Sequence, residues 1–598
     1  MSSDEDDEFH EAEEELQIDD EEDTTAPPVR ASNCAIAVGV DKYGLPAGLP
    51  MTSDQIREGF GLFFKNQQTE AENFFAAYKD SIPLFSLGYS TMAFVRAIMS
   101  FETGDIQTAM KELGETEALA YAATAQESTF ASITRFVLRT KKEAMSSEQV
   151  HHTVITAECR MLTGLMQFVQ ESVMGFIKGG LNIRAAWKTY ERMWHIYESK
   201  ETPLDDETRG AVQFGIGTFN LINSILPAKM LKLVSILGFP SNREVALREL
   251  NHAHDGGGVR SPIAALLLLL YHVVIQSFFG FDSAEHIAEA NRVLGRSLQR
   301  FPDGGLFLVL SGRFNRLKRD INASIRDFER AVEAQKDWKQ LQHLCFYELG
   351  WCHFFNQQFA ESYDYFGRLV KDNEWSKGFY VYMQGLCKLE LGQREEAITL
   401  LRSVSDYMSR RYGGKTISVE QYVGRKVKQY VSADGQVSMV LPALEMMYLW
   451  NGFAQISRSA VKQLHDQLEA WVLVPENAER IASDPDVAAL VRLLRASMLR
   501  EQGPEFFTKA MEQLEVLEST KSTITSELWI IPHGRYEQAA ILLMAKTDDK
   551  KAKQMLVKAQ RYNQDYNFEM RLRLKMHLTW DHLKGMQDTG DDDGTDDN

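Results

Sequence analysis

Helical periodicity dominates the pattern of apolar and polar residues from about Ser53 onward. Apolar residues recur at intervals of three and four, which places them on one face of a helix, and the alternation typical of strands is almost absent. Residues 416–422 are a short exception at most. The sequence therefore predicts an all-α fold.

The most apolar segment is PIAALLLLLYHVVIQSFF, residues 262–279. The residues that follow its proline form a helix of about 26 Å, shorter than the roughly 30 Å core of a bilayer. His272 and Gln276 would also be costly in lipid. We expect a central helix that the flanking helices bury. A membrane span, or an interfacial or partner-binding helix, is the alternative.

A repeated spacing of small and bulky residues flanks this segment. A small residue in one helix is followed 12 positions later by a second small residue and 16 positions later by a bulky apolar one. This is the spacing of a tetratricopeptide unit, in which the second helix packs against the small residue of the first. The matching sets are Gly59, Ala71, Phe75 with Pro83; Ala97, Ala109, Leu113; Gly312, Ser324, Phe328 with Ala331; Gly350, Ser362, Phe366; Gly385, Ala397, Leu401; and Tyr536, Ala539, Ala540, Leu543, Ala552, Leu556, Ala559.

The order of these features predicts the domain organisation and the fold class. We expect a disordered acidic tail and linker (1–50), N-terminal tetratricopeptide-like repeats (51–145), a central helical region (146–300), C-terminal repeats (301–585) and a second disordered acidic tail (586–598). The fold class is all-α, a tetratricopeptide-like helical repeat array (α-solenoid) wrapped around a central apolar helical region. Within that region, Gly179 and Gly180 predict the end of a long helix that begins near Val150.

The net charge of -19 comes from the two ends of the chain. Of the 84 acidic residues, 14 lie in residues 2–23 and 6 in residues 588–598, so the remaining 64 nearly balance the 65 Lys and Arg residues. Such acidic blocks repel themselves and favour solvated, disordered tails. A near-neutral body argues against nucleic acid as a partner, because a polyanionic duplex requires a clustered basic face.

Motifs of catalysis, metal binding and secretion are absent from the sequence. The five cysteines form no CxxC pair, and residues 255–261, DGGGVRS, lack the spacing of a phosphate loop and predict a helix C-cap and turn. His151 and His152 are adjacent, so they lie on different helix faces and cannot chelate together. Gly215 and Gly217 lie inside a predicted helix, where small residues allow close packing. We expect no enzyme activity, no cofactor, no metal, and a cytoplasmic location.

Aromatic residues in the first helices of the repeats are candidate partner-binding positions. The first unit has Phe60, Phe63 and Phe64, and the unit of Gly350 has Tyr347, Trp351, Phe354 and Phe355. An apolar concave surface must be filled either by the chain itself or by an amphipathic ligand helix. We take Tyr347, Trp351 and Tyr382 as candidate anchors for a partner protein.

A basic cluster is the second candidate surface. It consists of Arg410, Arg411, Lys415, Arg425, Lys426 and Lys428, with Tyr412, Tyr422 and Tyr430 between them. We expect a solvated helix face with a loop. The alternatives are a site for an acidic partner, for an anionic membrane, or for the acidic tails of the chain.

Several segments resemble the tetratricopeptide repeat protein 39 family, which includes fungal inclusion-body clearance proteins. The resemblance covers roughly residues 52–585. Within it, the ELGWC segment is closest to the C-type members, whereas WSKGFYVYM (375–383) is more similar to the other members. It implies a non-catalytic helical repeat protein, in a family with members linked to cilium assembly, lipid and sterol homeostasis, or clearance of aggregates near lipid droplets. The segments are IKGGLNIRAAWKTYERM (177–193), GAVQFGIGTFNLINSILPAKMLKLVSILGFPSNRE (210–244), PIAALLLLLYHVVIQSFF (262–279), YELGWCHFF (347–355) and residues 562–574.

The residues and the resemblance together predict a scaffold or adaptor for protein–protein interaction. Its partners are other proteins of unknown identity. The alternative is a peripheral protein of the lipid-droplet or membrane surface that acts in inclusion-body clearance. Besides the cytoplasm, the ciliary base and the lipid-droplet or mitochondrial surface are the locations that the resemblance implies.

Overall fold

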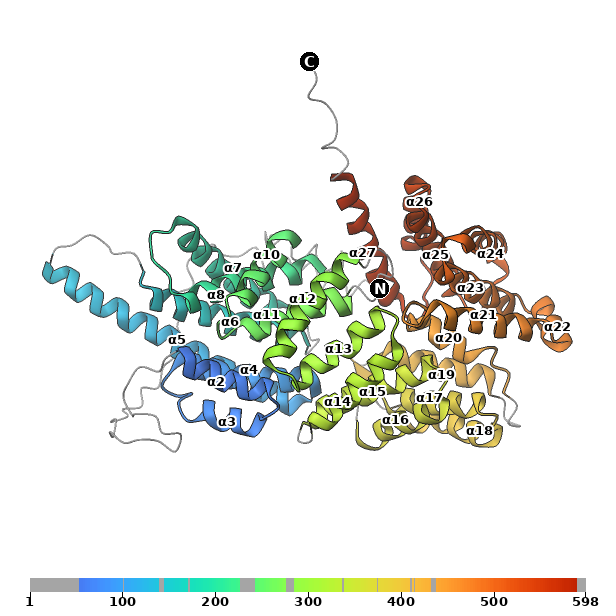
Figure 1. Ribbon diagram of the computed structural model, residues 1–598, viewed down its shortest axis with the longest axis horizontal. Helices are drawn as coiled ribbons and strands as arrows, with labels where there is room; N and C mark the ends of the chain where they lie inside the picture. Colours follow the sequence, from blue (N-terminus) through green and yellow to red (C-terminus); the bar gives the residue numbers. More distant parts are fainter. Residues whose placement is uncertain are drawn as a thin grey trace, which may run out of the picture. The chain divides into compact units, whose positions relative to one another are not determined.

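The computed structural model describes residues 53–100, 102–138, 145–169, 173–225, 242–275, 284–335, 338–373, 375–408, 411–412, 415–431 and 437–588. Helices account for most of these residues, and the predicted fold class, an all-α array of tetratricopeptide-like helix pairs, is confirmed (Figure 1). The regular strands in the described part are β1 (Arg411–Tyr412) and β2 (Lys415–Thr416), which pair antiparallel. The first predicted acidic tail lies outside the described residues; of the second, residues 586–588 form the end of a helix, against the predicted disorder, and 589–598 lie outside the described residues.

The chain divides into two compact units, and the first comprises Met1–Leu226 with Met230–Leu268. The domain boundaries expected from the sequence stay predictions. The helices of the first unit are α2 (Ser53–Phe64), α3 (Gln68–Ala76), α4 (Pro83–Ser100), α5 (Thr103–Leu138), α6 (Ser147–Val169), α7 (Val173–Ser199), α8 (Asp206–Ile225), α10 (Arg243–Asp255) and all but the last residue of α11 (Ser261–Leu269).

The second unit comprises Pro227–Lys229 with Leu269–Asn598, and its successive helix pairs run from green to red in Figure 1. It starts with the π-helix η1 (Leu270–Ile275), which continues from α11. The further elements are α12 (Ala284–Arg300), α13 (Gly305–Leu317), α14 (Ile321–Ala334), α15 (Lys339–Phe355), α16 (Phe359–Asp372), α17 (Lys377–Glu390), α18 (Arg394–Ser403), η2 (Val404–Tyr407), α19 (Ser418–Tyr430), α20 (Pro442–Leu449), η3 (Gly452–Ala454), α21 (Arg458–Val472), α22 (Pro475–Ser483), α23 (Pro485–Gln502), η4 (Pro504–Phe506), α24 (Phe507–Ser519), η5 (Lys521–Thr523), α25 (Ile530–Ala545), α26 (Asp549–Gln560) and α27 (Glu569–Asp588).

The helix pairs are closed by a bulky side chain of the second helix against a small residue of the first. In the pair α13 and α14, a Cβ atom added to Gly312 would lie 2.7 Å from the ring of Phe328. Real Cβ atoms do not approach so closely, so the ring occupies the space that a larger residue would fill. The predicted 16-residue spacing therefore marks a physical contact. The matching distances are 3.0 Å from Gly59 to Phe75, 3.0 Å from Gly350 to Phe366, and 2.8 Å from Gly385 to Leu401.

The helix end predicted at Gly179 and Gly180 is wrong, because α7 continues through both residues. A Cβ atom on Gly179 would lie 2.7 Å from the ring of Phe168 and 2.9 Å from the carbonyl oxygen of Gly164. A Cβ atom on Gly164 would in turn lie 2.9 Å from the carbonyl oxygen of Gly179. Glycine here lets α6 and α7 pack closely rather than ending a helix.

Two other predictions about glycines are confirmed. A Cβ atom on Gly215 would overlap the ring of Tyr190, at 1.8 Å from its Cε1 atom, so α8 packs closely against α7. Residues 255–261 form the predicted turn: α10 ends at Asp255 and Gly257 adopts a φ angle of 72°. Because that angle lies in the left-handed region, glycine is the residue that fits there without strain.

One side of the apolar segment is buried in protein over the part that the structure describes. The side chains of Ala264, Ala265, Leu268 and Leu269 are fully buried in α11, and η1 continues the helix to Ile275. Leu270 has 43% of its surface exposed, and the half-buried residues are Ile263, Leu266, Leu267, Val274 and Ile275. Among the described residues no helix is both long and apolar enough to cross a membrane. The remainder of the segment, 276–279, lies outside the described residues.

We expect Leu268→Asp to unfold the first unit, because an unpaired carboxylate in this interior costs several kcal/mol. Leu270→Asp is the matched control, since that side chain already meets solvent, and we expect it to cost less than about 1 kcal/mol. Thermal unfolding of the two purified variants measures the difference. A soluble, folded Leu268→Asp protein that changes its location in cells would contradict the buried assignment.

We expect Gly312→Ala to lower the free energy of unfolding by about 1–3 kcal/mol, because the added methyl group overlaps the ring of Phe328. Gly295→Ala in α12 is the control: a Cβ atom there meets nothing within 4 Å, and the better helix former should stabilise by about 0.5–1 kcal/mol. Opposite shifts in the melting temperature check the prediction. Equal shifts would mean that the contact between Gly312 and Phe328 does not determine how closely α13 and α14 pack.

Candidate functional site

The first candidate site surrounds Trp450, in the turn after α20. Its indole stacks on the ring of Trp351 at 4.8 Å and on that of Phe379 at 5.2 Å between centroids. The indole Nε1 donates a hydrogen bond of 2.8 Å to the hydroxyl of Tyr347. The guanidinium carbon of Arg571, from α27, lies 4.3 Å from the centroid of the Trp450 ring. We call these five residues the Trp450 cluster.

The Trp450 cluster shows which side chains cover the aromatic face of α15, the first helix of the repeat that contains Gly350. Trp351 is 1% exposed, and Phe354 and Phe355 are buried as well. Of the two expected occupants, the chain itself and a ligand helix, the chain itself is the one found at this repeat. Phe60, Phe63 and Phe64 of the first repeat are also buried. As anchors for a partner, Tyr347 and Trp351 would first have to be released from contacts inside the chain.

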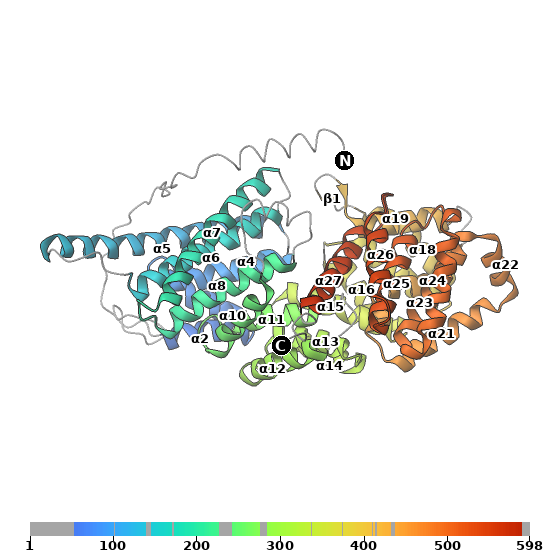
Figure 2. The same cartoon turned by 90° about the horizontal axis from the view of Figure 1, so that it is seen from above.

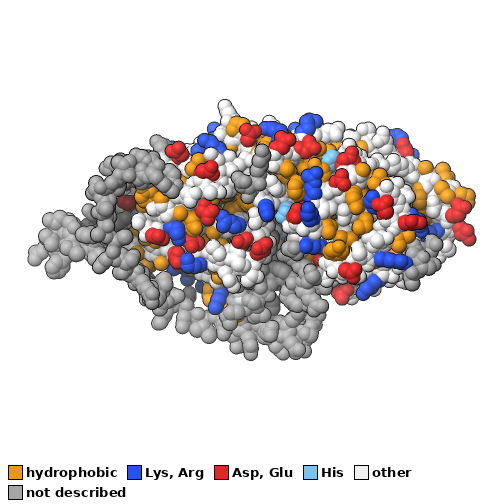
Figure 3. All heavy atoms as spheres, turned by 90° about the horizontal axis from the view of Figure 1, so that it is seen from below, with side chains coloured by type: hydrophobic (Ala, Val, Ile, Leu, Met, Phe, Trp, Pro, Cys, Tyr) orange, Lys and Arg blue, Asp and Glu red, His pale blue; other side chains and the backbone are white. Residues whose placement is uncertain are grey.

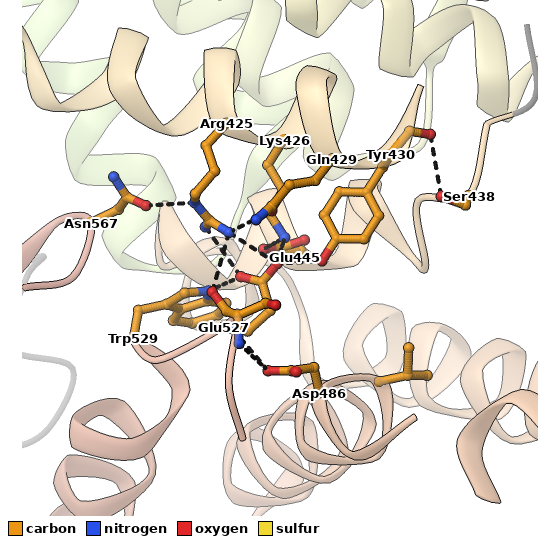
Figure 4. Close-up of polar contacts among 12 residues, drawn as sticks. Arg425, Lys426, Gln429, Tyr430, Ser438, Glu445, Asp486, Glu527, Trp529 and Asn567 are labelled. Carbon is orange, nitrogen blue, oxygen red and sulfur yellow. Dashed lines mark hydrogen bonds and ion pairs between the residues drawn. The ribbon is translucent and has the colours of Figure 1, made fainter. Parts of the chain in front are cut away.

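The second candidate site surrounds Glu527, in the loop before α25 (Figure 4). The Arg425 Nη2 atom lies 3.1 Å from Glu527 Oε2 and the Lys426 Nζ atom 2.8 Å from Glu527 Oε1. Two neutral donors complete the set: the Tyr430 hydroxyl at 2.8 Å and the Trp529 indole nitrogen at 2.7 Å. We call this arrangement, together with Glu445, the Glu527 cluster.

Glu445 gives Lys426 a second carboxylate. The Lys426 Nζ atom lies 2.6 Å from Glu445 Oε1, and Lys426 and Glu445 are only 4% and 2% exposed. Charges as deeply buried as these are stable only when they are paired. Burial alone would raise the pKa of Glu527, yet the charges of Lys426 and Arg425 outweigh it and lower that pKa to about 2. Burial raises the pKa of Glu445, against the opposing effect of Lys426.

Asp486, in the first turn of α23, holds the loop that carries Glu527. Its carboxylate accepts hydrogen bonds from the backbone nitrogens of Thr525, Ser526 and Glu527, the last at 2.8 Å. It also accepts one from the Thr525 hydroxyl at 3.1 Å. Because four donors converge on one carboxylate, the loop has a fixed conformation and Glu527 points toward α19.

A small cavity lies beside Lys426. About 20 Å³ of it is open to the centre of a water molecule, which is room for about one water. A site for a drug-sized ligand needs roughly 300 Å³ or more, so the cavity is not such a site. Its lining consists of Tyr382, Lys426, Tyr430, Met439, Val440, Pro442, Glu445, Asp486, Val487, Leu490 and Glu527.

The residues of the predicted basic cluster differ in their burial and do not form one exposed surface in the part that the structure describes. Arg425 is half-buried and Lys426 buried, both paired as described, so the expected solvated face is wrong for Lys426. Lys428 is exposed on the same helix. The backbone of Arg411 lies in β1, whereas its side chain and the whole of Arg410 lie outside the described residues. Tyr382 is fully buried beside Tyr422, with ring centroids 6.5 Å apart.

The residues that pair with Arg425 and Lys426, or hold the loop of their partner, were not found from the sequence. Glu445 and Glu527 are the partners and Asp486 holds the loop, and they lie 19 to 102 positions away from Arg425 or Lys426 along the chain. No spacing connects them, because helix pairs bring them together in three dimensions. On the face that Figure 3 shows, acidic and basic side chains are mixed, in keeping with the near balance of charge in the body of the chain.

One family model and several solved structures are similar to this chain. A family model described as Iml2/Tetratricopeptide repeat protein 39 matches residues 57–502, more than half of the chain. Among solved structures, yeast Tom70 is 11% identical with a TM-score of 0.31, and the match covers 90% of this chain and 96% of that one. The tetratricopeptide domain of P58(IPK) is 11% identical (TM-score 0.17; 89% and 98% covered), and the APC/C hetero-tetramer Cut9–Hcn1 is 12% identical (TM-score 0.23; 85% and 96% covered).

We expect Glu527→Gln to lower the free energy of unfolding by about 3–5 kcal/mol, because it leaves the buried Lys426 and the half-buried Arg425 with one carboxylate, that of Glu445. Asp466→Asn removes the exposed ion pair with Lys462, at 2.6 Å, and should cost at most about 0.5 kcal/mol. Chemical denaturation of both variants measures the contrast. Similar small effects would show that the Glu527 cluster contributes little to stability.

The ionised Glu527 carboxylate also makes the stability of the wild type depend on pH in a way that the stability of Glu527→Gln does not. The pKa of Glu527 falls from its ordinary 4.5 to about 2 in the folded protein. The carboxylate therefore stabilises the fold fully above its ordinary pKa, by roughly 3 kcal/mol, and this contribution is lost as the pH falls from 4.5 toward 2. The stability difference between wild type and Glu527→Gln should shrink over that range. A constant difference would contradict the assignment.

Proposed function

The chain belongs to the Iml2/Tetratricopeptide repeat protein 39 family, and we propose that it acts as a non-enzymatic scaffold that binds other proteins through the outer surfaces of its helix pairs. Stacked helix pairs provide extended surfaces, and such arrays generally mediate protein–protein interaction. The buried ionisable groups of the Glu527 cluster, Glu445, Lys426 and Glu527, neutralise one another.

The choice of the outer surface as the partner-binding surface rests on one observation. Trp450 already covers the aromatic face of the C-terminal repeats formed by Trp351 and Phe379. A partner helix could reach Trp351 only by displacing a tryptophan that stacks on two rings and donates a hydrogen bond. Partner contacts are therefore favoured on the outer edges of the repeats. Trp and Tyr are the residues that most often dominate the binding energy of protein interfaces.

Trp375 and Tyr407 are the partly exposed aromatic residues at one such edge. Each has 38% of its surface exposed. Trp375 lies just before α17 and Tyr407 at the end of η2, and the two segments are in contact, since a Cβ atom on Gly378 would lie 3.0 Å from the Met408 side chain. The proposed partner surface is this edge, with Lys428 as a candidate peripheral charge.

We propose a cytoplasmic location, and cilium assembly or lipid homeostasis as the processes involved. The family resemblance supports these processes. A lipid-surface role in inclusion-body clearance is the alternative, and it would require an apolar helix or a basic face that reaches the membrane. Leu268 and Lys426 are both buried, so neither of these two residues supports it.

We expect the amount of partner protein that co-purifies with the double variant Trp375→Ala, Tyr407→Ala to be at least about tenfold lower than with the wild type. Truncating an aromatic residue in an interface commonly costs about 2 kcal/mol or more of binding energy. Leu391→Ala is the control, since it is 42% exposed at the other end of α17. Quantitative affinity purification with a check of the melting temperature measures the effect. An unchanged set of partners, or an equal loss with Leu391→Ala, would contradict the proposed edge.

A further inference from the structure

The outward face of α26 carries a row of basic side chains, which we call the α26 basic face: Lys550, Lys551, Lys553, Lys558 and Arg561. At 100° per residue these positions fall within about 160° of the helix circumference. The opposite side contains Ala552, Met555, Leu556 and Ala559, which pack in the core. The helix is therefore divided into an apolar inner side and a basic outer side.

The charges of this face are not neutralised by the described part of the chain. Lys551 forms one long ion pair with Glu515, at 3.6 Å. Lys550, Lys553, Lys558 and Arg561 form no ion pair among the residues that the structure describes. Asp548 lies at the start of the helix, where it caps the backbone nitrogen of Lys551 at 2.8 Å. This contrasts with Arg425 and Lys426, which are paired inside the protein.

An acidic segment of complementary charge follows α27, the helix that packs against the inner side of α26. Residues 588–598 contain six Asp and no Lys or Arg, and the first of these Asp residues is the last residue of α27. Leu572, Met576 and Leu583 of α27 share a core cluster with the inner side of α26, and both helices are drawn in red in Figures 1 and 2. Ten extended residues reach about 33 Å, which exceeds both the length of α26, about 18 Å, and the diameter of a helix, about 10–12 Å.

We propose that the acidic segment 588–598 binds the α26 basic face of the same chain and shields it from other polyanions. Each exposed ion pair contributes less than about 1 kcal/mol, but a short tether gives the segment an effective concentration in the millimolar range. The contact is thus reversible and depends on ionic strength. It is independent of the proposed partner edge at Trp375 and Tyr407.

Zero-length carbodiimide crosslinking of the full chain, read by mass spectrometry, tests the contact directly. We expect monomeric crosslinks from Asp591, Asp592 or Asp593 to the lysines of the α26 basic face, reduced several-fold at 0.5 M salt because the charges are screened. Crosslinks from this segment spread equally to the exposed Lys371 and Lys509 would overturn the proposal. So would crosslinks to the face that come mainly from the acidic residues 4–23.

A synthetic peptide of residues 588–598 provides the second measurement. In the full chain with the six Asp residues of that segment changed to Asn, the face is uncovered, and we expect the peptide to bind at least about tenfold more tightly than to the wild type, by fluorescence anisotropy. Adding Lys550→Glu, Lys553→Glu and Lys558→Glu should abolish binding, whereas Lys339→Glu, Lys371→Glu and Lys509→Glu should not. Equal affinity for the wild type and the Asn variant would overturn the proposal.

Discussion

Two helices pack most closely where one of them carries no side chain larger than a methyl group, and the repeats of this chain meet that condition with glycine or alanine. A ring or a leucine side chain of the second helix then occupies the space, as Phe328 does beside Gly312. This contact fixes how far apart the paired helices lie and how far one is rotated against the other. The positions of all other side chains on the pair, including those at the surface, follow from it.

Buried charge pairs give the helices a further constraint on their orientation. The guanidinium of Arg260 binds both oxygens of Glu158 in the first unit, at 2.6 and 2.7 Å. In the second unit Arg500 binds Glu537 at 2.7 Å, and Lys426 lies between two carboxylates. A charge in the interior tolerates little displacement from its partner, whereas an apolar side chain can slide. Such pairs therefore favour one alignment of the helices over its neighbours.

Local spacing allowed the fold class and the helix pairs to be predicted, because the contact between Gly350 and Phe366 joins residues 16 positions apart. Gly179 shows where local reasoning fails: glycine disfavours a helix by itself, but close packing against α6 outweighs that preference. The two candidate sites could not be predicted as clusters. Glu527 and Trp450 lie about a hundred positions from Lys426 and Tyr347, and nothing in the sequence near either pair signals the contact.

The position of Trp450 has a kinetic consequence. Repeat arrays normally fold through contacts between neighbours, which form as the chain is made. Here the rings of Trp351 and Phe379 stay uncovered until Trp450 has been synthesised, and Arg571 closes the cluster some 220 residues after Trp351. At 5–20 residues per second, the 99 residues from Trp351 to Trp450 take roughly 5–20 s. During that time the nascent repeats present an aromatic surface to other chains, and the complete cluster forms only once α27 has been made.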